Sequence, residues 1–206
     1  MKLAKRIGYY RRHGLLIDRL LHQFRRLGIR IFIYYLIREG EDYSALPALK
    51  GNIEEYSFDF LPPAEIKEWS EKSDKDQKEA FFVERMNKGN TCYCAKHQGR
   101  IVAYTWIDFE ECRLIEHIFR LKEGEAYLYD MYTMPAFRGR NIAPHLRQRC
   151  HAALKKMGIH TFYSLSERFN TPAVNLKKKL NGKFLRLYLY VDLWKKYKRN
   201  FLLRKY

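Results

Sequence analysis

The segment Met134-Pro-Ala-Phe-Arg-Gly-Arg-Asn-Ile-Ala-Pro144 decides the fold. The residues before it, Glu125–Met134, predict a strand that Pro135 stops. The residues after it, Ile142–Met157, have the apolar spacing of an amphipathic helix, and the turn between them contains Gly139. A helix that begins directly after a turn presents unpaired backbone N–H groups and the positive end of its dipole. The segment therefore predicts a site for the phosphate groups of a ligand.

The side chains of this turn fit the same interpretation. Arg138 and Arg140 add fixed positive charge, while Gly139 and Ala143 let a ligand approach the backbone closely. The alternative is an ordinary strand–turn–helix with basic residues near the helix start. The elements around the turn help to weigh the two interpretations.

Working outward from the turn, the sequence predicts alternating helices and strands. Before the turn we expect a strand over Glu54–Phe60, helices over Pro63–Ser70 and Asp76–Asn87, and a hairpin of Asn90–Lys96 and Arg100–Asp108. After the helix of the turn we expect a strand over His160–Ser166, a helix over Thr171–Leu180 and a strand over Phe184–Trp194. Strands and helices in this mixture predict an α+β domain that begins near residue 51.

The turn resembles the acetyl-CoA signature of the GNAT (N-acetyltransferase) superfamily. That signature is Arg/Gln-x-x-Gly-x-Gly/Ala, commonly introduced by Pro-x-x-Arg-Gly, and Pro135–Ala143 matches it except at Asn141. Asparagine is the residue other than glycine that best tolerates left-handed backbone angles. The order of the elements over 54–194 is also similar to that of the family. The resemblance implies a mixed, mostly antiparallel central sheet flanked by helices, and acetyl-CoA as acyl donor.

The resemblance further implies which residues contact acetyl-CoA. Backbone groups of the strand before the turn would hold the pantetheine arm, and the turn would hold the pyrophosphate. A second block, Ser166–Leu176, is similar to the family's Asn-x-x-Ala/Ser element, although Asn170 is also an expected helix N-cap. The implied contacts are Tyr132, Thr133, Met134, Arg138, Gly139, Arg140, Asn141, Ile142, Ala143, Asn170 and Ala173.

Direct transfer to an amine needs a base that removes a proton from the acceptor. The candidates are Glu125, Asp130 and Glu167, of which we expect only one to act. Glu125 and Asp130 are five positions apart, so they point to opposite faces if their strand is regular. In many relatives a tyrosine protonates the departing thiolate, but this chain has Lys177 there. The run Lys177–Lys179 favours a solvated basic face over a catalytic role.

Phenols are alternative proton donors, although aromatic residues in strands usually serve packing. Histidines are further alternatives, but neither candidate pairs with a nucleophile in the sequence. These alternatives are Tyr127, Tyr129, Tyr132, Tyr163, His145 and His160.

The N-terminal part differs in composition from the rest. Apolar residues recur at helical spacing between Leu15 and Phe24 while Arg and His fill the other face, which predicts a basic amphipathic helix. Residues 29–37 fit either a strand or a continuing helix. We therefore expect a basic N-terminal extension and linker over 1–50, the GNAT-like domain over 51–194 and a basic tail over 195–206.

Composition excludes some classes of protein. With 47% hydrophobic residues the chain is too apolar to be disordered, and no uninterrupted apolar stretch has the length of a membrane span or the core of a signal peptide. The four cysteines show no metal-ligand spacing, so we expect reduced thiols, no metal and a cytoplasmic protein. A formal charge of +17 attracts polyanions, and docking on the inner membrane surface is compatible with it.

The leading hypothesis is an acyl-CoA-dependent N-acyltransferase that acts on an amine of an unidentified acceptor, and the basic charge is compatible with an anionic acceptor. The alternatives are a catalytically silent binding module with the same fold, or a basic protein that binds an anionic membrane or, less favoured, nucleic acid. The sequence is compatible with a homodimer and does not establish one.

Overall fold

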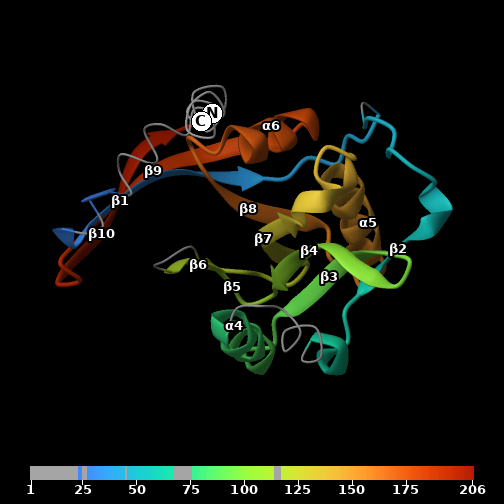
Figure 1. Ribbon diagram of the computed structural model, residues 1–206. Coiled ribbons are helices and arrows are strands. Elements are labelled where there is room, and N and C mark those ends of the chain that lie inside the picture. Colours follow the sequence, from blue (N-terminus) through green and yellow to red (C-terminus); the bar gives the residue numbers. More distant parts are fainter. Residues whose placement is uncertain (1–22, 25–26, 45, 67–75, 114–116) are drawn as a thin grey trace, which may run out of the picture. The chain divides into compact units, whose positions relative to one another are not determined.

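The computed structural model describes residues 23–24, 27–44, 46–66, 76–113 and 117–206 (Figure 1). The chain divides into two compact units, one over Tyr43–Tyr163 and the other formed by the N-terminal part up to Asp42 together with Ser164–Tyr206. The predicted N-terminal amphipathic helix lies almost entirely outside the described residues. The division of the chain into 1–50, 51–194 and 195–206 stays a prediction.

The unit Tyr43–Tyr163 is built on a mixed sheet. Its strands are β2 (Tyr56–Phe60), β3 (Thr91–His97), β4 (Arg100–Asp108), β7 (Glu125–Thr133) and the start of β8 (Thr161–Glu167). The pairs β2–β3, β3–β4 and β4–β7 are antiparallel, and β7 pairs with β8 in parallel. The prediction of a mostly antiparallel mixed sheet is confirmed. A separate hairpin of β5 (Glu111–Arg113) and β6 (His117–Arg120) was not predicted, nor was the 3-10 turn η2 (Ile53–Glu55).

Helices cover both faces of this sheet. Successive side chains of a strand point to opposite faces, so Tyr93 and Ala95 of β3 join one apolar cluster while Cys92 and Cys94 join the other. Helix α5 (Ile142–Lys156) contributes Leu146, Cys150 and Leu154 to the first cluster. Helix α4 (Asp76–Asn87) contributes Phe82 and Met86 to the second. The turn before α5 and the residues of α4 are thereby fixed on opposite sides of β7 and β4 (Figure 1).

The other unit joins the two ends of the chain. Its antiparallel strands are β1 (Ile29–Arg38), β9 (Lys183–Leu193) and β10 (Tyr197–Lys205), and α6 (Thr171–Lys179) precedes β9. The segment left open between strand and helix is thus strand β1, paired with β9 from Ile29–Leu193 to Arg38–Lys183. Residues 195–206, expected as a tail, include β10. For β1, long-range pairing with β9 supplies what local patterning left undetermined, whereas β10 forms a hairpin with the strand directly before it.

A buried ion pair connects the residue directly after β1 to α6 within this unit. Lys177 donates from Nζ to Glu39 Oε1, and the two residues are 4% and 6% exposed. The interpretation of Lys177 as part of a solvated basic face was therefore wrong, whereas Lys178 and Lys179 are exposed. Burial of a lysine requires a partner for its charge, and Glu39, which the sequence places far away, provides it.

Removal of one partner of this pair should destabilise the protein strongly. We expect Lys177→Met to lower the free energy of unfolding by about 3–5 kcal/mol, because the Glu39 carboxylate then stays buried without its cation. The double variant Glu39→Leu/Lys177→Met should recover most of that loss, and Lys178→Met at an exposed position should change little. Urea denaturation followed by circular dichroism measures all three. A single variant as stable as the wild type would contradict the assignment.

Candidate functional site

The junction between β7 and α5 is a turn with two left-handed residues. The short helix η3 (Pro135–Phe137) follows β7, and Gly139 has φ +79°. A Cβ at Gly139 would meet no atom within 4 Å, so glycine serves the backbone angle there rather than the available space. Asn141 has φ 64° and ψ 22° and is the N-cap of α5. Asparagine at the family's glycine position therefore adopts the left-handed conformation that its residue type favours.

The side chain of Asn141 fixes the turn from outside. Its Nδ2 donates to the carbonyl of Ala48 at 2.8 Å, and the side chain makes no capping hydrogen bond to α5. Lys50 N donates to the Arg140 carbonyl at 3.1 Å, and His145 Nε2 lies 3.0 Å from the Pro47 carbonyl. The strap 47–50 thus holds both the turn and the first turn of α5. Because Asn141 does not cap the helix, the first N–H groups of α5 are left for a ligand.

The two arginines of the turn lie against aromatic rings. The Arg138 guanidinium lies 5.3 Å from the Tyr132 ring centroid, and its Nε donates to the Thr133 carbonyl at 3.0 Å. The Arg140 guanidinium lies 4.8 Å from the Phe137 ring. Both arginines remain exposed. The structure therefore brings the predicted residues Tyr132 to Ala143 together at one positively charged helix start.

Asn170 and Ala173 belong to the other unit, at the start of α6. Asn170 Oδ1 accepts a hydrogen bond from Ala173 N at 3.3 Å, so the expected N-cap is confirmed. Their predicted contact with a cofactor stays a prediction.

Strand β7 is paired with β8 only at its beginning. The parallel ladder covers Glu125 to Tyr127, opposite Thr161 to Tyr163. The part of β7 that approaches the turn, from Leu128 onward, lies beyond this ladder. This is the stretch whose backbone would hold an extended ligand arm.

A bulge interrupts β7 at Asp130. Tyr104 is opposite Tyr132 and Trp106 is opposite Tyr129, so β7 has one more residue than β4 across this interval. Asp130 has φ +45°. Strand β7 is therefore not regular, so the condition under which Glu125 and Asp130 would point to opposite faces is not met.

The bulge directs two consecutive residues toward the same arginine. Arg85 Nη1 of α4 donates to Asp130 Oδ2 at 2.7 Å. The guanidinium also lies 4.8 Å from the Tyr129 ring and 5.1 Å from the Trp106 ring. The Arg85 side chain is 11% exposed and that of Asp130 is 41% exposed. The carboxylate is thus oriented by a nearly buried cation while it remains accessible to solvent.

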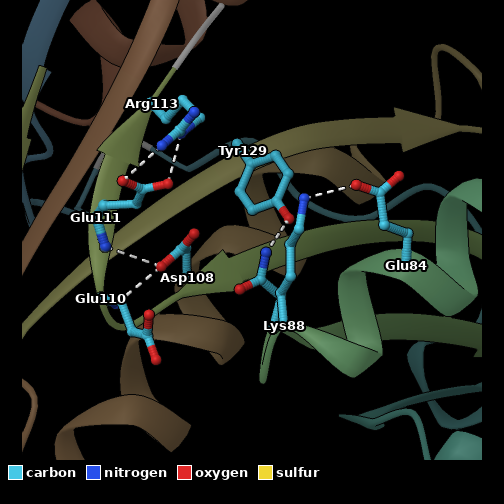
Figure 2. Close-up of polar contacts among 8 residues, drawn as sticks. Glu84, Lys88, Asp108, Glu110, Glu111, Arg113 and Tyr129 are labelled. Atoms are coloured by element: carbon cyan, nitrogen blue, oxygen red, sulfur yellow. Dashed lines mark hydrogen bonds and ion pairs between the residues drawn. The ribbon is translucent and has the colours of Figure 1, made fainter. Parts of the chain in front are cut away.

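The neighbouring phenols keep their protons. Burial raises the pKa of the Tyr129 phenol to about 12 and raises the pKa of Tyr127 well above its usual value. Asn90 Nδ2 donates to the Tyr129 oxygen at 2.7 Å, so the phenol proton itself is not used in that bond. Figure 2 shows Tyr129 between two groups of charged residues: Glu84 of α4 with Lys88 directly after the helix, and Asp108 at the end of β4 with Glu111 at the start of β5.

The remaining candidates have structural contacts. Glu125 accepts hydrogen bonds from Lys122 N at 2.9 Å and from Tyr163 Oη at 3.2 Å, at the first residue of β7. Glu167 is on β8 in the other unit. His145 contacts the strap described above, and His160 is exposed beside the Gly124 carbonyl.

Sequence reasoning missed Arg85. The available signal was a single arginine within the apolar stripe of a predicted helix, three positions after Phe82 and one before Met86. Among the described residues, no group of three or more His, Cys, Asp or Glu is placed to hold a metal ion. The same residues include no helix long and apolar enough to cross a membrane.

The left-handed angle of Asn141 can be tested by substitution. We expect Asn141→Val to lower the free energy of unfolding by about 1–2 kcal/mol, because a β-branched residue is strained at this φ. Asn141→Gly should cost less than about 1 kcal/mol, the worth of the lost bond to Ala48. Asn175→Val, at an exposed position of α6, is the control. Thermal denaturation of the three variants checks the order, and equal effects of Val and Gly at 141 would contradict it.

Comparisons with known proteins agree with the fold described above. No curated protein matched the sequence. Among solved structures, similarity extends to the glucosamine N-acetyltransferase region of a fungal multi-domain β-N-acetylglucosaminidase, with 14% identity and a TM-score of 0.56 over 84% of this chain and 22% of that chain. A tandem GNAT protein from the clavulanic acid biosynthesis pathway gives 14% identity and a TM-score of 0.54 over 82% and 56%.

A third structure, a GNAT-family acetyltransferase from Novosphingobium aromaticivorans described as putative, gives 16% identity and a TM-score of 0.51 over 78% of this chain and 63% of that chain. This chain therefore spans less than two-thirds of each of these three structures, and at such identities the likeness concerns the fold. The model of the Acetyltransferase (GNAT) family matches residues 53–182, which is more than half of the sequence and includes the whole β7–α5 junction. The chain belongs to the GNAT acetyltransferase family.

Proposed function

We propose that this protein transfers an acyl group, in the first place acetyl, directly from acyl-CoA to an amine. The observation that carries the proposal is the start of α5, where the Arg138–Ala143 turn has left-handed Gly139 and Asn141, a helix N-terminus without a cap from Asn141, and two exposed arginines. Backbone N–H groups at a helix N-terminus bind phosphate, and arginine adds charge-assisted hydrogen bonds. These features fit the pyrophosphate of coenzyme A.

The part of β7 that lies beyond its ladder with β8 supports the same ligand. The backbone of Tyr132, Thr133 and Met134 leads from the bulge to the turn, so an extended pantetheine arm bound along it would place its thioester toward Asp130. Coenzyme A would supply the activated acyl group. The protein would supply position and proton transfer.

Asp130 is the strongest of the three candidate bases. Glu125 is used by the Lys122 and Tyr163 contacts, whereas Asp130 is oriented by Arg85 and is 41% exposed. The Asp130 carboxylate would accept the proton of the acceptor ammonium, directly or through one water, which leaves the amine lone pair free to attack the thioester carbon. The bond that forms is the amide C–N bond, and the bond that breaks is the C–S bond. The attacking nitrogen loses a second proton after the bond has formed, and this proton balances the one that the departing thiolate gains.

The departing thiolate needs a proton, and Tyr129 can donate one. Its raised pKa keeps the phenol protonated at neutral pH, and Asn90 donates to its oxygen rather than taking its proton. Lys177, at the position of the family's usual tyrosine, is buried with Glu39, which argues against it as the donor.

Binding of acetyl-CoA tests the first part. We expect saturable binding of acetyl-CoA in isothermal titration, weaker binding of ATP, and a loss of at least about tenfold in affinity in the variant Arg138→Glu/Gly139→Glu. The matched control is Gly99→Glu/Arg100→Glu, which makes the same exchange at the β3–β4 hairpin, where Gly99 also has a positive φ. Unchanged binding in the first variant would refute the assignment of the turn.

Turnover tests the second part. With acetyl-CoA and a panel of amines, namely an amino sugar, a peptide with a free N-terminus and a polyamine, we expect thiol release that Asp130→Asn lowers by about 10²–10⁴-fold in kcat. Asp59→Asn, at an exposed position of β2, should not change it. Acetyl-CoA binding without turnover on any amine would instead favour a silent binding module. An unchanged kcat in Asp130→Asn would move the base to Glu125 or Glu167.

A further inference from the structure

The β9–β10 hairpin has an exposed apolar surface that acyl transfer does not explain. Large hydrophobic residues between 194 and 206 are 39–62% exposed, with Trp194 the most exposed of them. We call residues 194–206 the hairpin surface. Its exposed hydrophobic residues are Trp194, Tyr197, Phe201, Leu202, Leu203 and Tyr206.

The same residues are strongly basic. Six of the thirteen positions from 194 to 206 are Lys or Arg and none is Asp or Glu. The acidic residue just before them, Asp192, is 0% exposed and is ion-paired with Arg30 of β1, so it does not offset their charge at the surface. The basic residues of the hairpin surface are Lys195, Lys196, Lys198, Arg199, Arg204 and Lys205.

The tip of the hairpin is held in one conformation. Trp194 and Lys195 have φ values of +53° and +60°, which non-glycine residues rarely adopt. Trp194 N donates to the Gly28 carbonyl at 2.7 Å, and a Cβ at Gly28 would lie 2.7 Å from the indole Cδ1. Lys195 N donates to Asp192 Oδ1 at 2.9 Å. The indole is thus fixed on one side by Gly28 while 62% of the residue stays exposed. Leu27, the residue before Gly28, is 64% exposed beside it.

From these features we propose that the hairpin surface docks this protein on an anionic phospholipid bilayer. Tryptophan and tyrosine prefer the level of the lipid headgroups, and leucine side chains gain free energy from the acyl-chain boundary. Lysine and arginine near the surface are attracted by anionic lipids. The hairpin surface combines all three kinds of side chain over the turn 194–196 and strand β10, and a preorganised tip loses little entropy when it inserts.

Other occupants fit these residues less well. A second copy that paired its β10 with this one would place like charges opposite each other without an acidic partner on the strand, which disfavours the pairing. Nucleic acid would use the basic residues but would gain nothing from exposed Leu202 and Leu203. The bilayer is the partner that uses both the charge and the apolar area.

Sedimentation with lipid vesicles tests the proposal. The full chain should bind vesicles that contain about 30% phosphatidylserine and bind pure phosphatidylcholine vesicles at least about tenfold more weakly, with a decline as salt is added. Trp194 emission should shift to the blue on binding, and Trp194→Phe should abolish that shift. Vesicle binding without a shift in fluorescence emission that depends on Trp194 would overturn the proposal.

Matched variants separate the hairpin surface from overall charge. Lys195→Gln/Lys196→Gln should weaken binding by about tenfold, whereas Lys155→Gln/Lys156→Gln, which removes the same charge from the end of α5, should not. Leu203→Ser should weaken binding by about fivefold, whereas Met157→Ser, at an equally exposed position, should not. The proposal fails if the protein binds none of the vesicles, or if Lys155→Gln/Lys156→Gln weakens binding as much as Lys195→Gln/Lys196→Gln does. It also fails if analytical ultracentrifugation shows a dimer that the hairpin variants convert to monomers.

Discussion

The β7–α5 junction depends on one constraint: the backbone must turn from a strand into a helix through two left-handed residues. Glycine meets this requirement at position 139 without cost, whereas Asn141 needs support, and the carbonyl of Ala48 gives it. The Asn141 side chain makes no capping hydrogen bond to α5. Asn141 therefore supports the turn through the strap, while the start of α5 keeps N–H groups that its side chain does not cap.

The bulge in β7 has a comparable role for the other half of the proposed site. An extra residue in one strand re-aims the side chains around it, and here it presents both Tyr129 and Asp130 to Arg85. A nearly buried guanidinium between two rings needs an anion nearby, and Asp130 provides it. The carboxylate thus stabilises the packing of α4 on the sheet while it faces solvent. Asp130 differs in this respect from Glu125, whose hydrogen bonds with Lys122 and Tyr163 lie at the start of β7.

Much of the fold could be predicted from the sequence because most elements have strong local signals. The helix Asp76–Asn87 and the strand Arg100–Asp108 were predicted with the bounds observed, and the phosphate-type turn was found from Gly139 and its flanking residues. What failed depended on distant partners. The sequence predicts a solvated Lys177 because it does not show that Glu39 lies beside it in the fold. Residues 29–37 form a strand because they pair with β9. No residue type in the run of alternating residues marks the bulge at Asp130. The role of Arg85 depends on its contacts with Trp106 of β4 and Tyr129 of β7, which the sequence does not show.

The pairing of β1 with β9 has a consequence for synthesis on the ribosome. Arg30 and Asp192, which join the two strands, are 162 residues apart, so β1 emerges long before its partner exists. At usual rates of translation that interval lasts about 10–30 s, long compared with the folding of a local unit such as Tyr43–Tyr163. During it, an apolar strand with unpaired backbone groups is a target for aggregation or for a chaperone. The two units therefore mature in sequence, with the one built from both chain ends completed last.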